Sequence, residues 1–358
     1  MYLELVALSA ETEPAKGGFQ IPSLDGVRGI AVLLVVASHA GYRFASAALG
    51  VNAFFFLSGF LITTLLRREH AKSNAISFRK FYIRRTLRIF PPMYLTLVAV
   101  LVLVATGVVV SDANPGAIVA QFFHLTNYTL VTHHRVLPGT EMMWSLSVEE
   151  HFYLCFPLLF TFLVRLSPRQ SLSIVISVCL IVFAWRSFAI ITHLIPSNWA
   201  YQASDTRIDS ILWGCAMALF LNPYFDAERA RKLDRPWLGA VAVVGLVATQ
   251  AFRADWYSHT FRYTLQCLCF FPLFVMAIRR PTQFPFTLLN RQPLVWIGTI
   301  SYSLYLYHHV VVRVLEEQTT LKRSALMLVT LALSLPLCWL SYRLIEQPAG
   351  RLRKRFSA

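Results

Sequence analysis

Apolar segments of membrane-spanning length recur along almost the whole chain, from residue 24 to residue 345. A helix needs about 20 consecutive apolar residues to cross the hydrocarbon core of a bilayer. Only 14% of the 358 residues are charged, which is far below the usual share in a soluble domain. The sequence predicts an all-α, polytopic membrane protein with about ten transmembrane helices in one bundle, at 24–43, 50–66, 90–110, 145–165, 171–191, 208–222, 237–251, 263–278, 294–313 and 324–344.

Basic residues account for the net charge of +15 and gather in short loops between the apolar segments. This pattern indicates membrane topology and does not indicate nucleic acid as a partner. The strongest basic cluster, Arg67 to Arg88, follows the second span, so we place it in the cytoplasm. Alternation then predicts that both termini are cytoplasmic. We expect a cytoplasmic segment at 1–20, a membrane domain at 21–348 and a basic cytoplasmic tail at 349–358.

The stretch 21–40, a helix candidate that contains most of the first predicted span, carries three ionisable residues on an otherwise apolar helix: Asp25, Arg28 and His39. Eleven steps of 100° place Arg28 and His39 on one face, about 16 Å apart along the axis. Ionisable residues on a membrane helix are costly and usually mark a pathway or a site. The alternative is an interfacial Asp–Arg pair with an unrelated buried histidine.

A basic segment at 78–95 places Arg84, Arg85 and Arg88 just before a membrane helix, with Pro91 and Pro92 expected to stop or kink that helix. Arginines one turn apart form a fork that binds phosphates well. The same cluster is also typical of a cytoplasmic anchor that touches anionic lipid headgroups. Both interpretations stay open on this pattern alone.

Adjacent carboxylates, Glu149 and Glu150, lie near the start of the fourth span, and Ser145 is an i,i+4 neighbour of Glu149. One of them could orient a histidine or raise its basicity. Alternatively, both stabilise the start of the helix through its dipole.

Two further groups are candidates for supporting roles. Arg207 and Asp209 stand at the mouth of the sixth span, and Tyr305 and His308 lie within the ninth. Interfacial aromatic belts explain the tyrosine well. His308 is harder to explain in that way because it sits well inside an apolar helix. We expect no metal site, because the cysteines and histidines lack metal-ligand spacing.

Six segments together resemble the acyltransferase 3 family of integral membrane acyltransferases. They are SLDGVRGIAVLLVVASH, GVNAFFFLSGFLIT, RRTLRIFPP, WSLSVEEHFYLCFP, SYSLYLYHH and SYRLIEQP. The resemblance covers nearly the whole chain. It departs from the family at the ninth helix, where Tyr307, His308, His309 and Val310 replace an aromatic-His-aromatic-Pro pattern. The resemblance is to the stand-alone form, without the esterase-like domain that longer members append.

The resemblance implies an acyl-coenzyme A donor, usually acetyl-CoA, at the cytoplasmic face of a bacterial inner membrane, with no permanently bound cofactor. Arg84, Arg85 and Arg88 would then hold the donor phosphates, and Arg28 would extend this positive lining inward. Asp25 would hold Arg28 in position. Membrane lipid would be the surrounding partner.

On the acceptor side, the resemblance implies a hydroxyl on a cell-surface or exported carbohydrate or a related metabolite. His39 would act as general base or as a transient acyl carrier. Glu149 or Glu150 would orient His39 and stabilise its cationic form. Two other functions stay open on the residues: a transporter or flippase of a lipid-linked or free metabolite, and a membrane scaffold in polysaccharide assembly.

Overall fold

The computed structural model describes residues 21–42 and 46–356, and all regular structure in these two ranges is helical. Within these ranges, the ten longer helices are α2 (Pro22–His39), α3 (Ala47–Ser73), α4 (Phe78–Ala105), α7 (Trp144–Leu163), α8 (Pro168–Ile191), α10 (Ser204–Phe220), α12 (Pro236–Ala251), α14 (Phe261–Arg279), α16 (Ser301–Gln318) and α17 (Arg323–Ser341). The all-α prediction is confirmed. The segment predicted at 1–20 lies outside the described residues.

Shorter helical pieces connect the long helices. They are α5 (Pro115–Phe122), α6 (Thr126–Val131), η1 (Glu141–Met143), α9 (Ser197–Gln202), α11 (Ala227–Ala230), α13 (Asp255–His259), η2 (Phe286–Asn290), α15 (Gln292–Thr299), the π-helical turn η3 (Tyr342–Glu346) and α18 (Gln347–Lys354). The predicted boundary between membrane domain and tail, at residue 348, falls inside α18.

In the described part of the chain, six helical segments are long and apolar enough to cross a membrane: 47–73, 78–105, 141–163, 168–191, 261–279 and 323–353. Their outward faces carry exposed apolar side chains, such as Leu158 on α7 and Ile181 on α8. Exposed apolar faces on helices of spanning length are expected for a membrane protein. The membrane class is therefore confirmed, while the count of ten spans and the cytoplasmic termini stay predictions.

Two predicted spans differ in detail from the structure. The ninth is not one helix, because the chain breaks at Ile300, whose ψ of 7° separates α15 from α16. The prolines at 91 and 92 do not stop α4, which continues from Phe78 to Ala105. Proline removes a backbone donor and so frees a carbonyl one turn earlier. Tyr302 donates a 2.7 Å hydrogen bond to the carbonyl of Ile89, beside the freed carbonyls.

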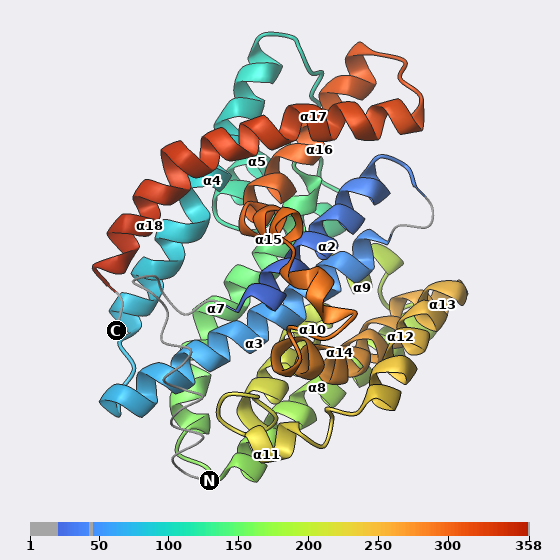
Figure 1. Ribbon diagram of the computed structural model, residues 1–358. Helices are drawn as coiled ribbons and strands as arrows, with labels where there is room; N and C mark the ends of the chain where they lie inside the picture. Colours follow the sequence, from blue (N-terminus) through green and yellow to red (C-terminus); the bar gives the residue numbers. More distant parts are fainter. Residues whose placement is uncertain (1–20, 43–45, 357–358) are drawn as a thin grey trace.

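Helix α2 lies in the middle of the bundle and packs against α3, α15, α16 and η2 (Figure 1). Glycines allow this close approach. A Cβ on Gly298 of α15 would collide with the backbone of Asp25, and one on Gly29 would collide with the backbone carbonyl of Leu294. Small residues allow membrane helices to pack backbone to backbone. These contacts set the depth and rotation of the helix that carries Asp25, Arg28 and His39.

The contact between α3 and α10 is equally close and is reciprocal. A Cβ on Gly59 would meet the carbonyl of Ile211, and a Cβ on Gly214 would meet the carbonyl of Phe56. Both obstacles are backbone atoms, so the two helices would have to separate to admit a side chain. We conclude that this helix pair depends on glycine at both positions.

We expect Gly214→Ala to destabilise the protein by about 1–3 kcal/mol, the usual cost of overpacking a tight contact. Gly350→Ala is the matched control, because a Cβ there meets no atom within 4 Å and α18 gains helix propensity. Thermal unfolding in detergent compares the two variants. Equal unfolding temperatures would show that α3 and α10 tolerate a wider separation.

Candidate functional site

Three histidine rings meet where the end of α2 reaches α16. His39 is the last residue of α2, and its Nδ1 lies 2.8 Å from Nε2 of His308. The ring of His309 is tilted by 42° against that of His39, with the ring centres 4.4 Å apart. His308 is fully buried, whereas His39 and His309 are half-buried. The structure therefore joins two residues of the predicted site, His39 and His308, that are 269 positions apart.

Glu141 supplies the carboxylate at this histidine cluster. Its Oε2 lies 3.3 Å from Nδ1 of His309, and its side chain is 43% exposed. The sequence analysis missed both residues. His309 had a signal, since it stands where the family pattern places an aromatic residue. Glu141 had no such signal, because it lies between the predicted spans 90–110 and 145–165, outside every segment that the sequence analysis singled out.

The contacts do not place the predicted carboxylates on His39. Glu149 accepts hydrogen bonds from Ser58 at 2.8 Å and from Tyr153 at 3.2 Å. Oε1 of Glu150 has no hydrogen-bond partner in the described part of the chain. Both are half-buried, and both interact electrostatically with Arg85. The expectation that Glu149 or Glu150 orients His39 is therefore not met, because α7 turns both toward the arginines of α4.

A second polar cluster gathers at the opposite end of α2. Arg28 pairs with Asp25 at 3.7 Å, as expected, and also interacts electrostatically with Arg88, Glu149 and Glu346. Arg88 is half-buried and has no hydrogen bond or ion pair with any residue that the structure describes. Two guanidinium groups therefore lie close enough to repel each other, and neither donates a hydrogen bond to any residue in the described ranges.

The other two predicted arginines differ in how far their donors are used. Arg84 donates to Oε2 of Glu69 at 2.8 Å and to the carbonyl of Phe356 at 2.9 Å. Arg85 lies over the ring of Tyr153, 5.0 Å from its centre. A guanidinium on an aromatic face gains cation–π energy and keeps its edge donors. Arg85 can therefore still bind an anion, whereas Arg84 holds its own helix against Glu69.

Glu346 in η3 belongs to the arginine cluster and was missed by the sequence analysis. Its Oε1 accepts a 2.5 Å hydrogen bond from Ser303, and it interacts electrostatically with Arg28 and Arg88. The signal was its place in the segment SYRLIEQP, which was used only to recognise the family.

Ser145 and Tyr305 form a hydrogen-bonded pair that lies beside the histidine cluster. Their hydroxyl groups lie 2.7 Å apart, and that of Tyr305 also donates to the carbonyl of Met142 at 2.9 Å. The ring of Tyr305 lies 6.0 Å from that of His308. The structure therefore brings Ser145, Tyr305, His308 and His39 into one connected group.

Arg207 and Asp209 belong to neither cluster. Asp209 is fully buried and forms a two-pronged ion pair with Arg186 of α8, at 2.9 and 3.0 Å. Arg207 is also fully buried and lies over the ring of Tyr263, 3.7 Å from its centre. It donates to Asn52 at 3.3 Å. These contacts hold α10 against its neighbours, so we assign both residues to the framework of the bundle.

A family model described as an acyltransferase domain matches residues 21–343. That range contains α2, every predicted site residue and both polar clusters except Glu346. The chain belongs to the acyltransferase 3 family. The resemblance carried by the six sequence segments is thereby confirmed.

Members of the family with curated names include two relatives of similar sequence. The peptidoglycan O-acetyltransferase OatA of Listeria monocytogenes is 31% identical over 350 residues, which cover 92% of this chain and 55% of the relative. The O-acetyltransferase OatA of Staphylococcus aureus is 28% identical over 346 residues, covering 92% and 57%. The chain thus spans a little over half the length of these relatives. No solved structure is significantly similar to it.

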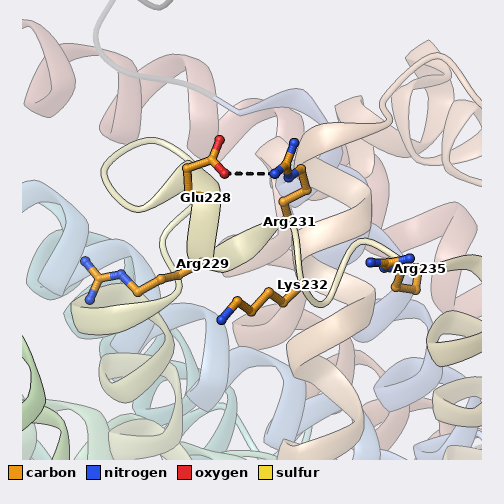
Figure 2. Close-up of a pocket in the computed structure, with 5 residues that line it drawn as sticks. All are labelled: Glu228, Arg229, Arg231, Lys232 and Arg235. Atoms are coloured by element: carbon orange, nitrogen blue, oxygen red, sulfur yellow. Dashed lines mark ion pairs between the residues drawn. The ribbon is translucent and has the colours of Figure 1, made fainter.

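A charged hollow of about 420 Å³ at α11 takes no part in this site. It is lined by Glu228, Arg229, Arg231, Lys232 and Arg235 (Figure 2). Arg231 pairs with Glu228 at 3.0 Å, and the charged ends of Arg229 and Arg235 lie on opposite sides of the picture. Side chains that do not converge form no anion site. This loop instead has the composition of a positively charged cytoplasmic loop.

Proposed function

We propose that this protein is a membrane O-acetyltransferase that moves an acetyl group from acetyl-CoA to a hydroxyl of a cell-envelope carbohydrate. The observation that supports this best is the placement of two polar clusters at the two ends of α2, in a member of an acyltransferase family. Arg28 and His39 are eleven residues apart, so about 16 Å of apolar helix separates the clusters. The arginine cluster is suited to binding phosphates, and the histidine cluster is suited to proton transfer.

The arginine cluster is the proposed donor site. Arg28 and Arg88 repel each other inside the bundle, and neither has a hydrogen-bond partner in the described part of the chain. A phosphate between them would relieve this repulsion and accept charge-assisted hydrogen bonds. Glu149 and Glu346 would hold the two guanidinium groups in place by electrostatic attraction, without accepting hydrogen bonds from them. Cytoplasmic acetyl-CoA would then extend its thioester along α2 toward His39.

The histidine cluster is the proposed reaction site. His39 would accept the proton of the acceptor hydroxyl while the hydroxyl oxygen forms a bond to the acetyl carbon. The carbon–sulfur bond then breaks, and the coenzyme A thiolate leaves and takes up the proton. His39 could alternatively carry the acetyl group between donor and acceptor. A neutral imidazole suits both steps at physiological pH.

The names of the relatives support a proposal for the acceptor substrate. Two proteins that match 92% of this chain are named O-acetyltransferases, one of them for peptidoglycan. We therefore propose a cell-wall carbohydrate as acceptor, and the bacterial inner membrane as location. The cytoplasm supplies the donor, and the acceptor hydroxyl approaches from the histidine end of α2.

We expect Arg88→Ala to weaken acetyl-CoA binding about tenfold or more, because a hydrogen bond to a charged group contributes about 1.5–3 kcal/mol. Calorimetric titration of the purified protein in nanodiscs measures the dissociation constant. Arg169→Ala is the matched control, because Arg169 is an exposed arginine at the start of α8. Higher salt should weaken binding to the wild type and less so to Arg88→Ala.

Consumption of the donor is best followed by chromatography of free coenzyme A. A thiol reagent would also react with the protein, because Cys155 is exposed and Cys269 is half-exposed. Equal affinities in Arg88→Ala and Arg169→Ala would remove Arg88 from the donor site. A wild-type protein that neither binds nor consumes acetyl-CoA would contradict the proposed function itself.

A further inference from the structure

The contact between His39 and His308 has the geometry of a straight hydrogen bond. The two ring planes differ by only 4°, and the ring centres are 5.1 Å apart. The contacting nitrogens are 2.8 Å apart. The ring centres can be 5.1 Å apart while the two nitrogens are 2.8 Å apart only if both nitrogens lie on the line between the two ring centres. The rings therefore meet edge to edge in one plane, and one N–H points directly at the other nitrogen.

The backbone determines which nitrogen carries the proton. Nδ1 of His308 lies 2.8 Å from the carbonyl oxygen of Leu304, one turn earlier in α16. A carbonyl can only accept, so Nδ1 of His308 must be the protonated nitrogen. His308 is fully buried in an apolar helix, none of its contacts with described residues is a carboxylate, and a charge there would be costly. Neutral His308 therefore presents a lone pair on Nε2.

The same reasoning extends to His39. Because Nε2 of His308 is an acceptor, Nδ1 of His39 must donate the proton between them. Neutral His39 then has its lone pair on Nε2, the nitrogen on the opposite edge of the ring. The structure describes no hydrogen-bond partner for that atom, and His39 is half-buried rather than enclosed. The free lone pair is thus available to a substrate.

We propose that His308 is a positioning residue that holds His39 in the Nδ1–H tautomer and thereby makes Nε2 the reactive nitrogen. In many enzymes that use a histidine as general base, a neighbouring group fixes the tautomer and orientation of its ring, and this group is usually a carboxylate. Here a neutral imidazole anchored on the Leu304 carbonyl takes that part. It replaces the role that the sequence analysis gave to Glu149 or Glu150.

This inference rests on the proposed function only for the identity of the substrate, since the tautomer itself can be observed without activity. Nitrogen-15 NMR of the histidine-labelled full chain in nanodiscs distinguishes protonated from unprotonated ring nitrogens. The His39 signals are assigned from their loss in His39→Gln. We expect Nδ1 of His39 to be protonated and Nε2 to be unprotonated. The opposite pattern would overturn the proposal, whether or not the protein consumes acetyl-CoA.

Two substitutions separate the two hydrogen bonds of His308. The amide oxygen of glutamine can take the place of Nε2, so His308→Gln should keep both the tautomer and most of the turnover. The amide nitrogen of asparagine can take the place of Nδ1 and keep the Leu304 contact, but this shorter side chain cannot reach His39. His308→Asn should therefore lower kcat at least about tenfold with little change in KM, since a buried positioning residue does not touch substrate.

His309→Gln is the control for the tautomer, because His309 lies against the ring of His39 without a hydrogen bond to it. It should leave the NMR pattern of His39 unchanged. Equal turnover and an unchanged pattern in folded His308→Asn would show that His308 only fills space. If wild-type turnover is absent while the NMR pattern is as expected, the proposed function fails and the tautomer assignment stands.

Discussion

Replacing His39 with alanine should lower the rate of acetyl transfer by about 10²–10⁴-fold, the usual contribution of a general base. The imidazole of His39 lies at the end of α2 with its Nε2 lone pair available, and Glu149 accepts hydrogen bonds from Ser58 and Tyr153 instead of contacting His39. Transfer of labelled acetyl from acetyl-CoA to a cell-wall saccharide measures the effect. Binding of acetyl-CoA should be nearly unchanged, because the arginine cluster lies about 16 Å away along the helix.

The matched control is His134→Ala, since His134 is an exposed histidine in the loop after α6. Both variants should remain folded at the temperature of the assay, although His39→Ala loses the hydrogen bond to His308 and should unfold somewhat below the wild type. If folded His39→Ala kept more than about a tenth of the wild-type turnover, His39 would be neither the base nor the acyl carrier. A loss of donor binding in the same variant would instead place His39 in the donor site.

Removing the carboxylate of Asp209 should destabilise the protein by about 3–5 kcal/mol, because it leaves the guanidinium of Arg186 unpaired in the interior. Both side chains are fully buried, and their ion pair is joined by the hydroxyl of Thr264, 3.1 Å from Arg186. Asp209→Ala is therefore expected to unfold well below the wild type, or to fail to accumulate. Thermal unfolding followed by fluorescence-detected gel filtration measures the shift.

Asp112→Ala is the control, because Asp112 forms an ion pair with Arg135 in which both side chains are largely exposed. A surface pair of this kind contributes about 0–1 kcal/mol. Replacing both buried partners, as in Arg186→Met with Asp209→Leu, should recover much of the stability, since no unpaired charge remains. Equal unfolding temperatures for Asp209→Ala and Asp112→Ala would show that the buried pair contributes little, and would return Asp209 to the list of candidate site residues.

Local pattern was enough to predict the class of fold and to place Arg28 and His39, one residue of each cluster, on one face of the same helix. Apolar segments of spanning length indicate membrane helices wherever they occur. The eleven-residue spacing of Arg28 and His39 follows from helix periodicity alone. Both inferences use only residues that are close in sequence, and for this reason they did not depend on how the helices pack.

The partners of these residues could not be predicted in the same way. Glu149 was expected at His39 and lies with the arginines, and Asp209 was expected at a site and instead pairs with Arg186 on another helix. Each outcome depends on the rotation and depth of a helix relative to a distant one. A rotation by one residue, about 100°, would turn each side chain to a different neighbour.

The sequence by itself determined that the chain is a bundle of membrane helices and that one of them carries an arginine near one end and a histidine at the other. Only the tertiary structure decided that His308 is the hydrogen-bond partner of His39 and that Glu346 and Arg88 both interact electrostatically with Arg28, the first attractively and the second repulsively. Contacts such as that of Gly298 on the backbone of Asp25 set these positions. Close packing between distant segments fixes helix rotation and depth, and the order of residues within one helix carries no such information.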